Sequence, residues 1–297
     1  MKLLITGGRG LLGSEFLRGA RARGWSVAAP SSVEMDVTDA SACMRVLGAV
    51  SPDWVVHCAA FTAVDAAEEE PDQAMRVNRD GSANVARAAA EAGAGMAHIS
   101  TDYVFDGAKG SPYAPEDPMS PLGAYARSKV AAEQAVAAAG VNVGTAQGTT
   151  ETPQLIVRTG WLYGAGRRDF VDLVLGRKMT DEPLRIVDDQ WGRPTWTRNV
   201  VESVLDLIVR GARGIVHVND GGEATWHLFA QAILEESGSS GKVDRISSRG
   251  FDAAAERPLY SVLDLAATEF ELGRSMVPWR EALRTYLNER GRREPSE

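Results

Sequence analysis

The start of the chain constrains the fold most, because an apolar run leads directly into regularly spaced glycines. The run Lys2 to Thr6 predicts a short strand, and Gly7, Gly10 and Gly13 fit a tight turn followed by an amphipathic helix. A strand, a glycine turn and a helix in this order allow the backbone to approach a dinucleotide closely, with the helix N-terminus facing its pyrophosphate. We therefore predict a dinucleotide-binding unit here.

The rest of the chain continues the alternation of strand-like and helical segments. Strand patterns lie at 2–6, 25–29, 53–59, 95–100 and 154–159, and helix patterns lie at 11–23, 39–50, 71–93 and 121–139. This order predicts an α/β fold with a Rossmann-like, doubly wound parallel sheet. We expect a Rossmann domain at 1–160 and a smaller, mainly substrate-binding lobe at 161–297, in which the segment 195–220 returns to the Rossmann domain.

Composition excludes several classes of protein. The 297 residues carry 32 basic and 40 acidic side chains, a net charge of −8, which offers no footprint for nucleic acid or an anionic membrane. No apolar run is long enough to span a bilayer, and a strand pattern begins where a signal peptide would lie, so we expect a cytoplasmic protein. The histidines are scattered and the cysteines, Cys43 and Cys58, are few, which predicts neither a metal site nor a disulfide.

Tyr125 and Lys129 are the strongest chemical signal. Their four-residue spacing stacks a phenol and an ammonium on one helix face, and a nearby cation is expected to lower the pKa of the phenol until it can act as a proton donor. Ser120 and Pro121 predict that this helix begins at 121. Thr101 follows a strand pattern and can offer its hydroxyl to a substrate carbonyl.

Further motifs extend over nearly the whole length. They are HCAAFTAVDAAE at 57–68, RVN at 76–78, STDYVF at 100–105, RTGWLYG at 158–164, VDDQWGRPT at 187–195 and RPLYSVLD at 257–264. With these motifs the chain resembles an extended short-chain dehydrogenase/reductase, and more closely the dTDP-4-dehydrorhamnose reductase family. The resemblance implies hydride delivery from a nicotinamide to the 4-keto carbon of a dTDP-4-keto-6-deoxy sugar.

The resemblance also assigns roles to single residues. Tyr125 would donate the proton, Lys129 would bind the nicotinamide ribose, and Thr101 would bind the carbonyl. The remaining cofactor contacts would be Gly7, Arg9, Gly10, Leu11, Leu12, Gly13, Asp36, Val37, Ala60, Phe61 and Thr62. Further substrate contacts would be Asp102, Tyr103, Trp161, Arg193, Pro194 and Thr195.

The cofactor can be argued from the end of the second strand pattern. An acid there would accept hydrogen bonds from the adenosine ribose of NADH, and none follows Val27 directly. Arg9, Ser31 and Ser32 can instead bind a 2′-phosphate, and nothing obvious repels one, although Glu34 lies close by in the sequence. We therefore expect NADPH, with NADH as a second possibility.

Two departures from the family pattern bear on substrate and metal. Asp169 stands where members often have asparagine, so a negative charge near the substrate leaves the sugar open. Some members bridge a dimer through a divalent metal held by a glutamate at the position of Glu15, but the partner region, Thr197 to Asn199, lacks the expected acid. We predict no metal, and a homodimer stays open.

Three rival functions were weighed. A 4-keto reductase for another deoxysugar of antibiotic biosynthesis, such as a dihydrostreptose synthase, uses identical chemistry. A non-catalytic, NADP-binding regulatory subunit keeps the same fold, but the intact set of Thr101, Tyr125 and Lys129 argues against it. A sugar-nucleotide 4,6-dehydratase places a glutamate where this chain has Tyr103.

Overall fold

The computed structural model describes residues 1–140, 144–145, 148–149, 152–176, 183–239, 241–250 and 253–293. The glycine- and threonine-rich segment 141–152, whose polar composition predicts an exposed loop, falls mostly outside them. Within it, β5 (Gly144–Thr145) and β6 (Gly148–Thr149) pair in antiparallel fashion. The charged and small residues at 290–297 predict a frayed tail. Helix α11 (Trp279–Arg293) nevertheless continues to Arg293, where Arg290 pairs with Asp172 of another helix.

A six-stranded parallel sheet forms the centre of the molecule, in the order β12-β7-β4-β3-β1-β2. Its strands are β1 (Lys2–Thr6), β2 (Ser26–Ala28), β3 (Trp54–His57), β4 (Gly95–Ile99), β7 (Gln154–Arg158) and β12 (Gly214–His217). The order runs from β1 to β2 on one side and from β3 through β4 and β7 to β12 on the other, as in a doubly wound fold. The predicted α/β, Rossmann-like fold is confirmed.

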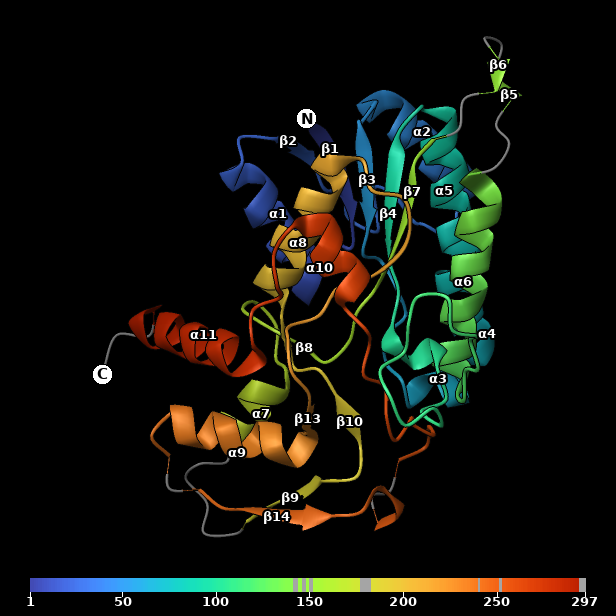
Figure 1. The fold of residues 1–297 in the computed structure, drawn as a ribbon. Coiled ribbons are helices and arrows are strands. Elements are labelled where there is room, and N and C mark those ends of the chain that lie inside the picture. Colours follow the sequence, from blue (N-terminus) through green and yellow to red (C-terminus); the bar gives the residue numbers. More distant parts are fainter. Residues whose placement is uncertain are drawn as a thin grey trace.

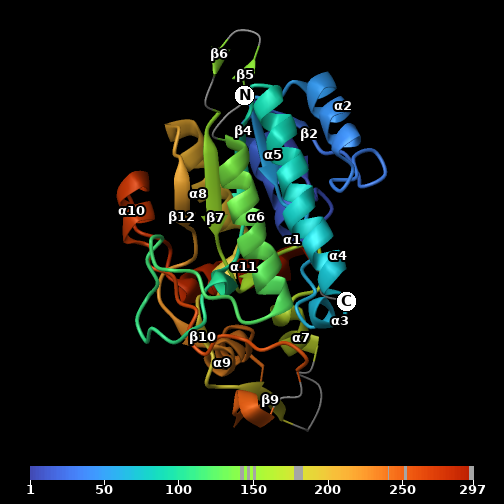
Figure 2. The ribbon, with the colours of Figure 1, turned by 90° about the vertical axis from the view of Figure 1, so that its right-hand side faces the viewer.

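Helices cover both faces of the sheet (Figure 1). One layer holds α1 (Leu11–Ala22), α8 (Thr197–Arg210) and α10 (Ala266–Leu272); the other, facing the viewer in Figure 2, holds α2 (Ala40–Val50), α5 (Gly81–Glu91) and α6 (Ala124–Gly140). Successive strand residues point to opposite faces, so Leu3 and Ile5 pack into the first layer and Leu4 into the second.

The C-terminal lobe lies below the sheet in Figure 1. Its helices are α7 (Phe170–Gly176), α9 (Trp226–Glu236) and α11, and its short strands are β8 (Leu162–Tyr163), β9 (Leu184–Val187), β10 (Trp191–Gly192), β11 (Thr195–Trp196), β13 (Ala224–Thr225) and β14 (Val243–Ile246). A separate aromatic core that includes Tyr163, Phe229 and Trp279 holds them together. The chain returns to the sheet between these elements, because α8 packs against α1 and β12 pairs with β7.

Two predicted helices differ from the structure. The segment 71–93 is divided into α4 (Pro71–Met75), a π-helical turn η1 (Arg76–Asp80) and α5. Helix α6 begins at Ala124 rather than at 121, because the Glu68 carboxylate accepts the Ala124 backbone N–H at 2.6 Å. Glu68 lies in the short helix α3 (Ala66–Glu69), so a distant acid rather than Ser120 provides this cap.

Candidate active site

The glycine turn joins β1 to α1 as a preformed anion cradle. Gly7 has φ +66°, its carbonyl accepts the Gly10 N–H at 2.8 Å, and a side chain at Gly13 would overlap the Gly7 backbone. Gly10 caps α1 and has no side chain to occupy the first N–H groups of the helix, those of Leu11 and Leu12. Arg9 is exposed at the tip. These features fit a dinucleotide pyrophosphate.

The loop after β3 lies beside this turn, because β1 and β3 pair in parallel up to Thr6 and His57. Ala60, Phe61 and Thr62, predicted for the ribose side, follow in that loop. The Asn78 amide holds the backbone of Phe61, accepting its N–H at 2.8 Å and donating to its carbonyl at 3.1 Å. Asn78 lies in the π-helical turn, a local distortion frequent at functional sites.

Asp36 and Val37, the residues predicted for the adenine side, lie in the loop after β2. The Asp36 carboxylate accepts the backbone N–H and the hydroxyl of Thr38, at 2.9 and 2.8 Å. Val37 packs against Gly81, where a Cβ would meet the valine side chain at 2.9 Å. Both predicted residues therefore shape the loop after β2.

Glu34 engages Ser31, one of the residues that we expected to bind a 2′-phosphate. Its carboxylate accepts the backbone N–H of Ser31 at 2.7 Å and the Ser31 hydroxyl at 2.8 Å. These hydrogen bonds lower the pKa of Glu34, and the Arg9 charge adds to the effect. The expectation that nothing repels a phosphate here was wrong, because a local turn brings this acid back onto Ser31.

Thr101, Tyr125 and Lys129 meet at the carboxyl end of β4. Thr101 is the second residue after that strand, its hydroxyl accepts the backbone N–H of Tyr103 at 3.2 Å, and Tyr125 is the second residue of α6. Lys129 is only 2% exposed, and its ammonium donates to the Ile99 carbonyl at 2.6 Å. The structure thus brings together the three residues that the sequence singled out, and a strand end fixes two of them.

The acidity of Tyr125 differs from the expectation. Burial raises its pKa to about 12, the hydrogen bond from Thr101 lowers it, and the Asp102 charge raises it. The Lys129 ammonium, which we expected to lower the pKa of this phenol, instead donates to the Ile99 carbonyl. Burial also lowers the pKa of Lys129 to about 8 against the opposing charge of Glu133, so the ammonium is present at neutral pH and is lost in mild alkali.

Three of the predicted substrate residues adjoin this set. The ring of Tyr103 meets that of Tyr125 edge-on, with 6.3 Å between centroids, and Asp102 is buried beside Thr101. Trp161 has a left-handed backbone, φ 55°, which costs free energy in a bulky residue. Its indole stacks on Trp226 at 3.7 Å, which holds the strained residue in place.

The remaining predicted contacts have structural partners. The Arg193 guanidinium donates to the carbonyls of Leu263 and Gly222, at 2.9 and 2.6 Å. The Thr195 hydroxyl donates to the Arg193 carbonyl, and Pro194 lies between these two residues. Arg193 therefore ties the segment before α8 to the C-terminal chain at Leu263, which the sequence motif alone did not reveal.

A cavity of about 930 Å³ opens beside Tyr103. The aromatic residues Phe170 and Trp226 line one part of it, and Arg185 and Arg249 add exposed cations. It lies among β9, the turn that follows β14 and the chain at 253–259. Such a mixed aromatic and basic lining suits a nucleotide with a diphosphate.

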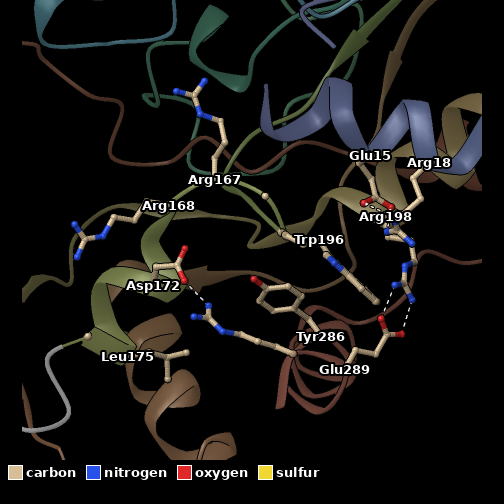
Figure 3. Close-up of a pocket in the computed structure, with 15 residues that line it drawn as sticks. Glu15, Arg18, Arg167, Arg168, Asp172, Leu175, Trp196, Arg198, Tyr286 and Glu289 are labelled. Carbon is tan, nitrogen blue, oxygen red and sulfur yellow. Dashed lines mark hydrogen bonds and ion pairs between the residues drawn. The ribbon is translucent and has the colours of Figure 1, made fainter. Parts of the chain in front are cut away.

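A second cavity, of about 750 Å³, lies between α1, α7, α8 and α11 (Figure 3). It contains Glu15, whose carboxylate pairs with Arg18, and Glu289, whose carboxylate pairs with the Arg198 guanidinium. The carboxylates here are thus matched with arginines. Across the described ranges no group of three or more His, Cys, Asp or Glu side chains is arranged to hold a metal ion.

Asp169 has a different place from the one expected. Its carboxylate accepts the N–H of Gly164 at 2.8 Å and that of Asp172 at 3.0 Å, so it closes the loop before α7 and caps that helix. The Asp169 carboxylate, which we expected near the substrate, is thus hydrogen-bonded to the backbone of its own loop and helix.

The chain is similar to known proteins over nearly its whole length. Residues 1–291 match the family described as the RmlD substrate binding domain. The chain is 38% identical to the spore coat polysaccharide biosynthesis protein SpsK of Bacillus subtilis over 289 residues (97% of this chain, 98% of that protein), and 37% identical to a dTDP-4-dehydrorhamnose reductase of Mycobacterium tuberculosis over 293 residues (96% and 92%). The dTDP-4-dehydrorhamnose reductase of Bacillus anthracis, solved with NADP, superposes with a TM-score of 0.90 at 31% identity, covering 97% of this chain and 99% of that one.

Proposed function

The chain belongs to the dTDP-4-dehydrorhamnose reductase family, and we propose that it reduces the 4-keto group of a dTDP-4-keto-6-deoxyhexose with NADPH. Among such sugars we propose dTDP-4-dehydrorhamnose, which would yield dTDP-rhamnose. The observation that carries the proposal is that the buried Thr101 and Lys129 and the half-buried Tyr125 lie together at the strand end beside the glycine turn.

The chemistry assigned to the chain is proton delivery and binding. A nicotinamide bound at the glycine turn supplies the hydride. Tyr125 donates its phenolic proton to the 4-oxygen, and the high pKa of this half-buried phenol keeps it protonated until the oxygen develops negative charge. Thr101 holds the carbonyl in reach of Tyr125, and Lys129 holds the nicotinamide ribose.

We infer that the cavity beside Tyr103 receives the nucleotide end of the substrate. It adjoins the catalytic tyrosine through Tyr103, and its aromatic and basic residues suit a base and a diphosphate. The sugar would then lie between Tyr125 and Trp161. In this proposal Arg185 and Arg249, rather than Arg193, supply the main positive charge for the diphosphate, since the Arg193 guanidinium already has two carbonyl partners.

For the cofactor we propose that NADPH is preferred, bound by Arg9 and by Ser31 once Glu34 has left it. The same geometry leaves NADH usable, because a ribose without phosphate can coexist with the Glu34 carboxylate. Comparison of the catalytic efficiency with both cofactors tests this preference. Equal or better efficiency with NADH would contradict it.

The test of the reaction is NADPH oxidation against a panel of dTDP-4-keto-6-deoxy sugars, with the product configuration read by NMR. Turnover fastest with the rhamnose precursor supports the proposal. Faster turnover of another sugar would favour the alternative, a reductase of another deoxysugar pathway. Binding of NADPH without turnover of any sugar would favour a regulatory subunit.

The described part of the chain has no helix with the length and apolar character of a membrane span. For the partners, we propose a small-molecule substrate and no nucleic acid, in line with the net charge of −8.

A further inference from the structure

Residues 59–69, the segment that joins β3 to α4, lie between the two proposed ligand sites. Ala60, Phe61 and Thr62, which we assign to the ribose side of the cofactor, lie near its start. Asp65 follows just before α3. Figure 1 shows α3 at the edge of the Rossmann domain that faces the C-terminal lobe. One short segment therefore reaches from the cofactor side to the neighbouring lobe.

The Asp65 carboxylate binds the C-terminal chain with both of its oxygens. One oxygen accepts a guanidinium N–H of Arg257 at 2.7 Å, and the other accepts a second N–H of Arg257 and the backbone N–H of Ala255, both at 3.0 Å. A forked pairing of this kind fixes the geometry of an arginine and a carboxylate. Arg257 lies 192 residues beyond Asp65, so only the tertiary fold brings the pair together.

This ion pair fixes a position more than it adds stability. The Asp65 side chain is 49% exposed, so solvent screens the two charges. The hydrogen bond from Arg257 lowers the pKa of Asp65, which keeps the carboxylate charged at neutral pH. The Arg257 guanidinium also donates to the Ala255 carbonyl at 3.0 Å. Both backbone groups of Ala255 are thus held through the same pair.

The chain held by Asp65 is a wall of the cavity beside Tyr103, which residues 253–257 line. The structure describes this stretch, and no part of it lies in a helix or strand. Its backbone position therefore depends on contacts with other segments, and the bonds to Asp65 tie it to the Rossmann domain. A displacement of Asp65 would move the wall that we propose to receive the nucleotide end of the substrate.

Hydrogen bonds stiffen the segment around Asp65. The Ala67 N–H donates to the Ala63 carbonyl at 3.0 Å, and the Glu68 N–H donates to the Asp65 carbonyl at 3.1 Å. The Glu68 carboxylate in turn caps the catalytic helix α6 at Ala124. Networks of hydrogen bonds and ion pairs of this kind can carry coupling between two sites.

The cofactor end of the segment is anchored beside the catalytic tyrosine. Phe61 and Tyr125 pack against one small apolar cluster, formed by Ala67, Ala74 and Ala124. A nicotinamide ribose bound against residues 60–62 adds contacts at this end. The cofactor, the tyrosine and the cavity wall thus share one structural element.

We propose that the ion pair of Asp65 and Arg257 couples the two ligand sites, so that bound NADPH tightens the binding of the sugar nucleotide. The inference rests on the proposed ketoreductase function for the identity of its two ligands. NADPH against residues 60–62 fixes the start of the segment, and Asp65 then holds the wall at 253–257 in place. The substrate orders less of the protein on binding to this preformed cavity. By linkage, the nucleotide tightens NADPH binding by the same factor.

The experiment measures binding without turnover. Calorimetry gives the affinity of dTDP for the enzyme alone and for the enzyme saturated with NADP⁺, which carries no hydride to transfer. In the wild type we expect NADP⁺ to tighten dTDP binding about tenfold. Asp65→Asn keeps the size of the side chain and removes its charge, so this factor should fall below about twofold. The NADP⁺ affinity of the variant without dTDP should stay at the wild-type value, which also shows that the fold is intact.

Arg257→Gln and the double variant complete a cycle. Where the pair acts as a unit, each single variant loses the coupling and the double variant loses no more. A different result would make Arg257 a direct contact of the nucleotide and overturn the inference: dTDP binding weakened equally with and without NADP⁺ in Arg257→Gln, together with full coupling in Asp65→Asn.

Glu236→Gln is the matched control. The Glu236 carboxylate also accepts two guanidinium N–H groups, those of Arg284 at 2.8 and 2.9 Å, but this pair joins α9 to α11 within the C-terminal lobe. Its loss should leave the coupling between NADP⁺ and dTDP at the wild-type value. Loss of coupling in this control as well would contradict a specific role for Asp65.

Steady-state kinetics provide a second readout. At saturating NADPH, Asp65→Asn should raise the KM for the keto-sugar nucleotide about tenfold with little change in kcat, because Asp65 lies outside the set of Thr101, Tyr125 and Lys129. Wild-type enzyme that binds dTDP equally well with and without NADP⁺ would overturn this inference and leave the reductase in place. Wild-type enzyme that shows the coupling but turns over no keto-sugar would instead overturn the proposed function alone.

Discussion

The two sides of the active-site cleft are built in different ways. The pyrophosphate cradle on the cofactor side is local, since the turn from Gly7 to Gly13 positions its own backbone N–H groups within one stretch of chain. The substrate side is assembled from distant segments, as where Ser261 and Gly160 fix Asp102. Substitutions on the cofactor side should therefore act on one ligand, whereas those on the substrate side should act on chemistry and on the packing between the lobes.

The largest expected effect is that of Tyr125→Phe. The ring stays packed but loses the proton donor, so turnover should fall roughly 10²- to 10⁴-fold while NADPH binding is nearly unchanged. Steady-state kinetics and titration of NADPH by fluorescence would check both halves. Retention of more than a tenth of wild-type turnover would show that another group donates the proton.

Lys129→Met should affect both sides of the comparison, because we propose that this ammonium, one helical turn from Tyr125, binds the nicotinamide ribose. Loss of a charged hydrogen bond is expected to weaken NADPH binding by about tenfold or more, together with lower turnover. Wild-type NADPH affinity should also decline as pH rises through about 8, where Lys129 loses its proton. Calorimetry across pH would measure this, and Lys129→Met should show no such decline.

Arg9→Ala and Glu34→Gln should act on the cofactor side alone. The first removes a cation and should raise the KM for NADPH about tenfold with little change for NADH. The second removes the anion that occupies Ser31 and should lower the KM for NADPH. A KM for NADPH that rises in Arg9→Ala and falls in Glu34→Gln would place the 2′-phosphate between these two residues. A KM that changes equally for NADPH and NADH would place the phosphate elsewhere.

The smallest effect is expected from Asp169→Ala. Loss of the cap on α7 should cost about 1 kcal/mol of unfolding free energy, measured in urea. Asp169→Asn retains an acceptor and should lose less. Relative rates across the sugar panel should stay constant in both, and a changed sugar preference would return Asp169 to the substrate site.

The sequence predicted most of what short-range patterns encode. The order of strands and helices, the glycine turn and the pairing of Tyr125 with Lys129 all follow from spacing along the chain. It missed the cap that Glu68 provides for α6 and the hold of Asn78 on Phe61, because nothing near either residue in the sequence reveals its partner. It also gave no sign of the carbonyl partners of Arg193, since an arginine in a conspicuous motif looks the same whether a ligand or a carbonyl accepts its N–H groups.

By itself, then, the sequence determined the α/β fold and the residues that can carry the chemistry, because hydrophobic period and glycine placement act over a few residues. The tertiary structure alone decided the acidity of Tyr125 and Asp102 and the partners of Glu34 and Ser261. Burial and hydrogen bonding set a pKa, and both depend on which distant segments the fold brings together.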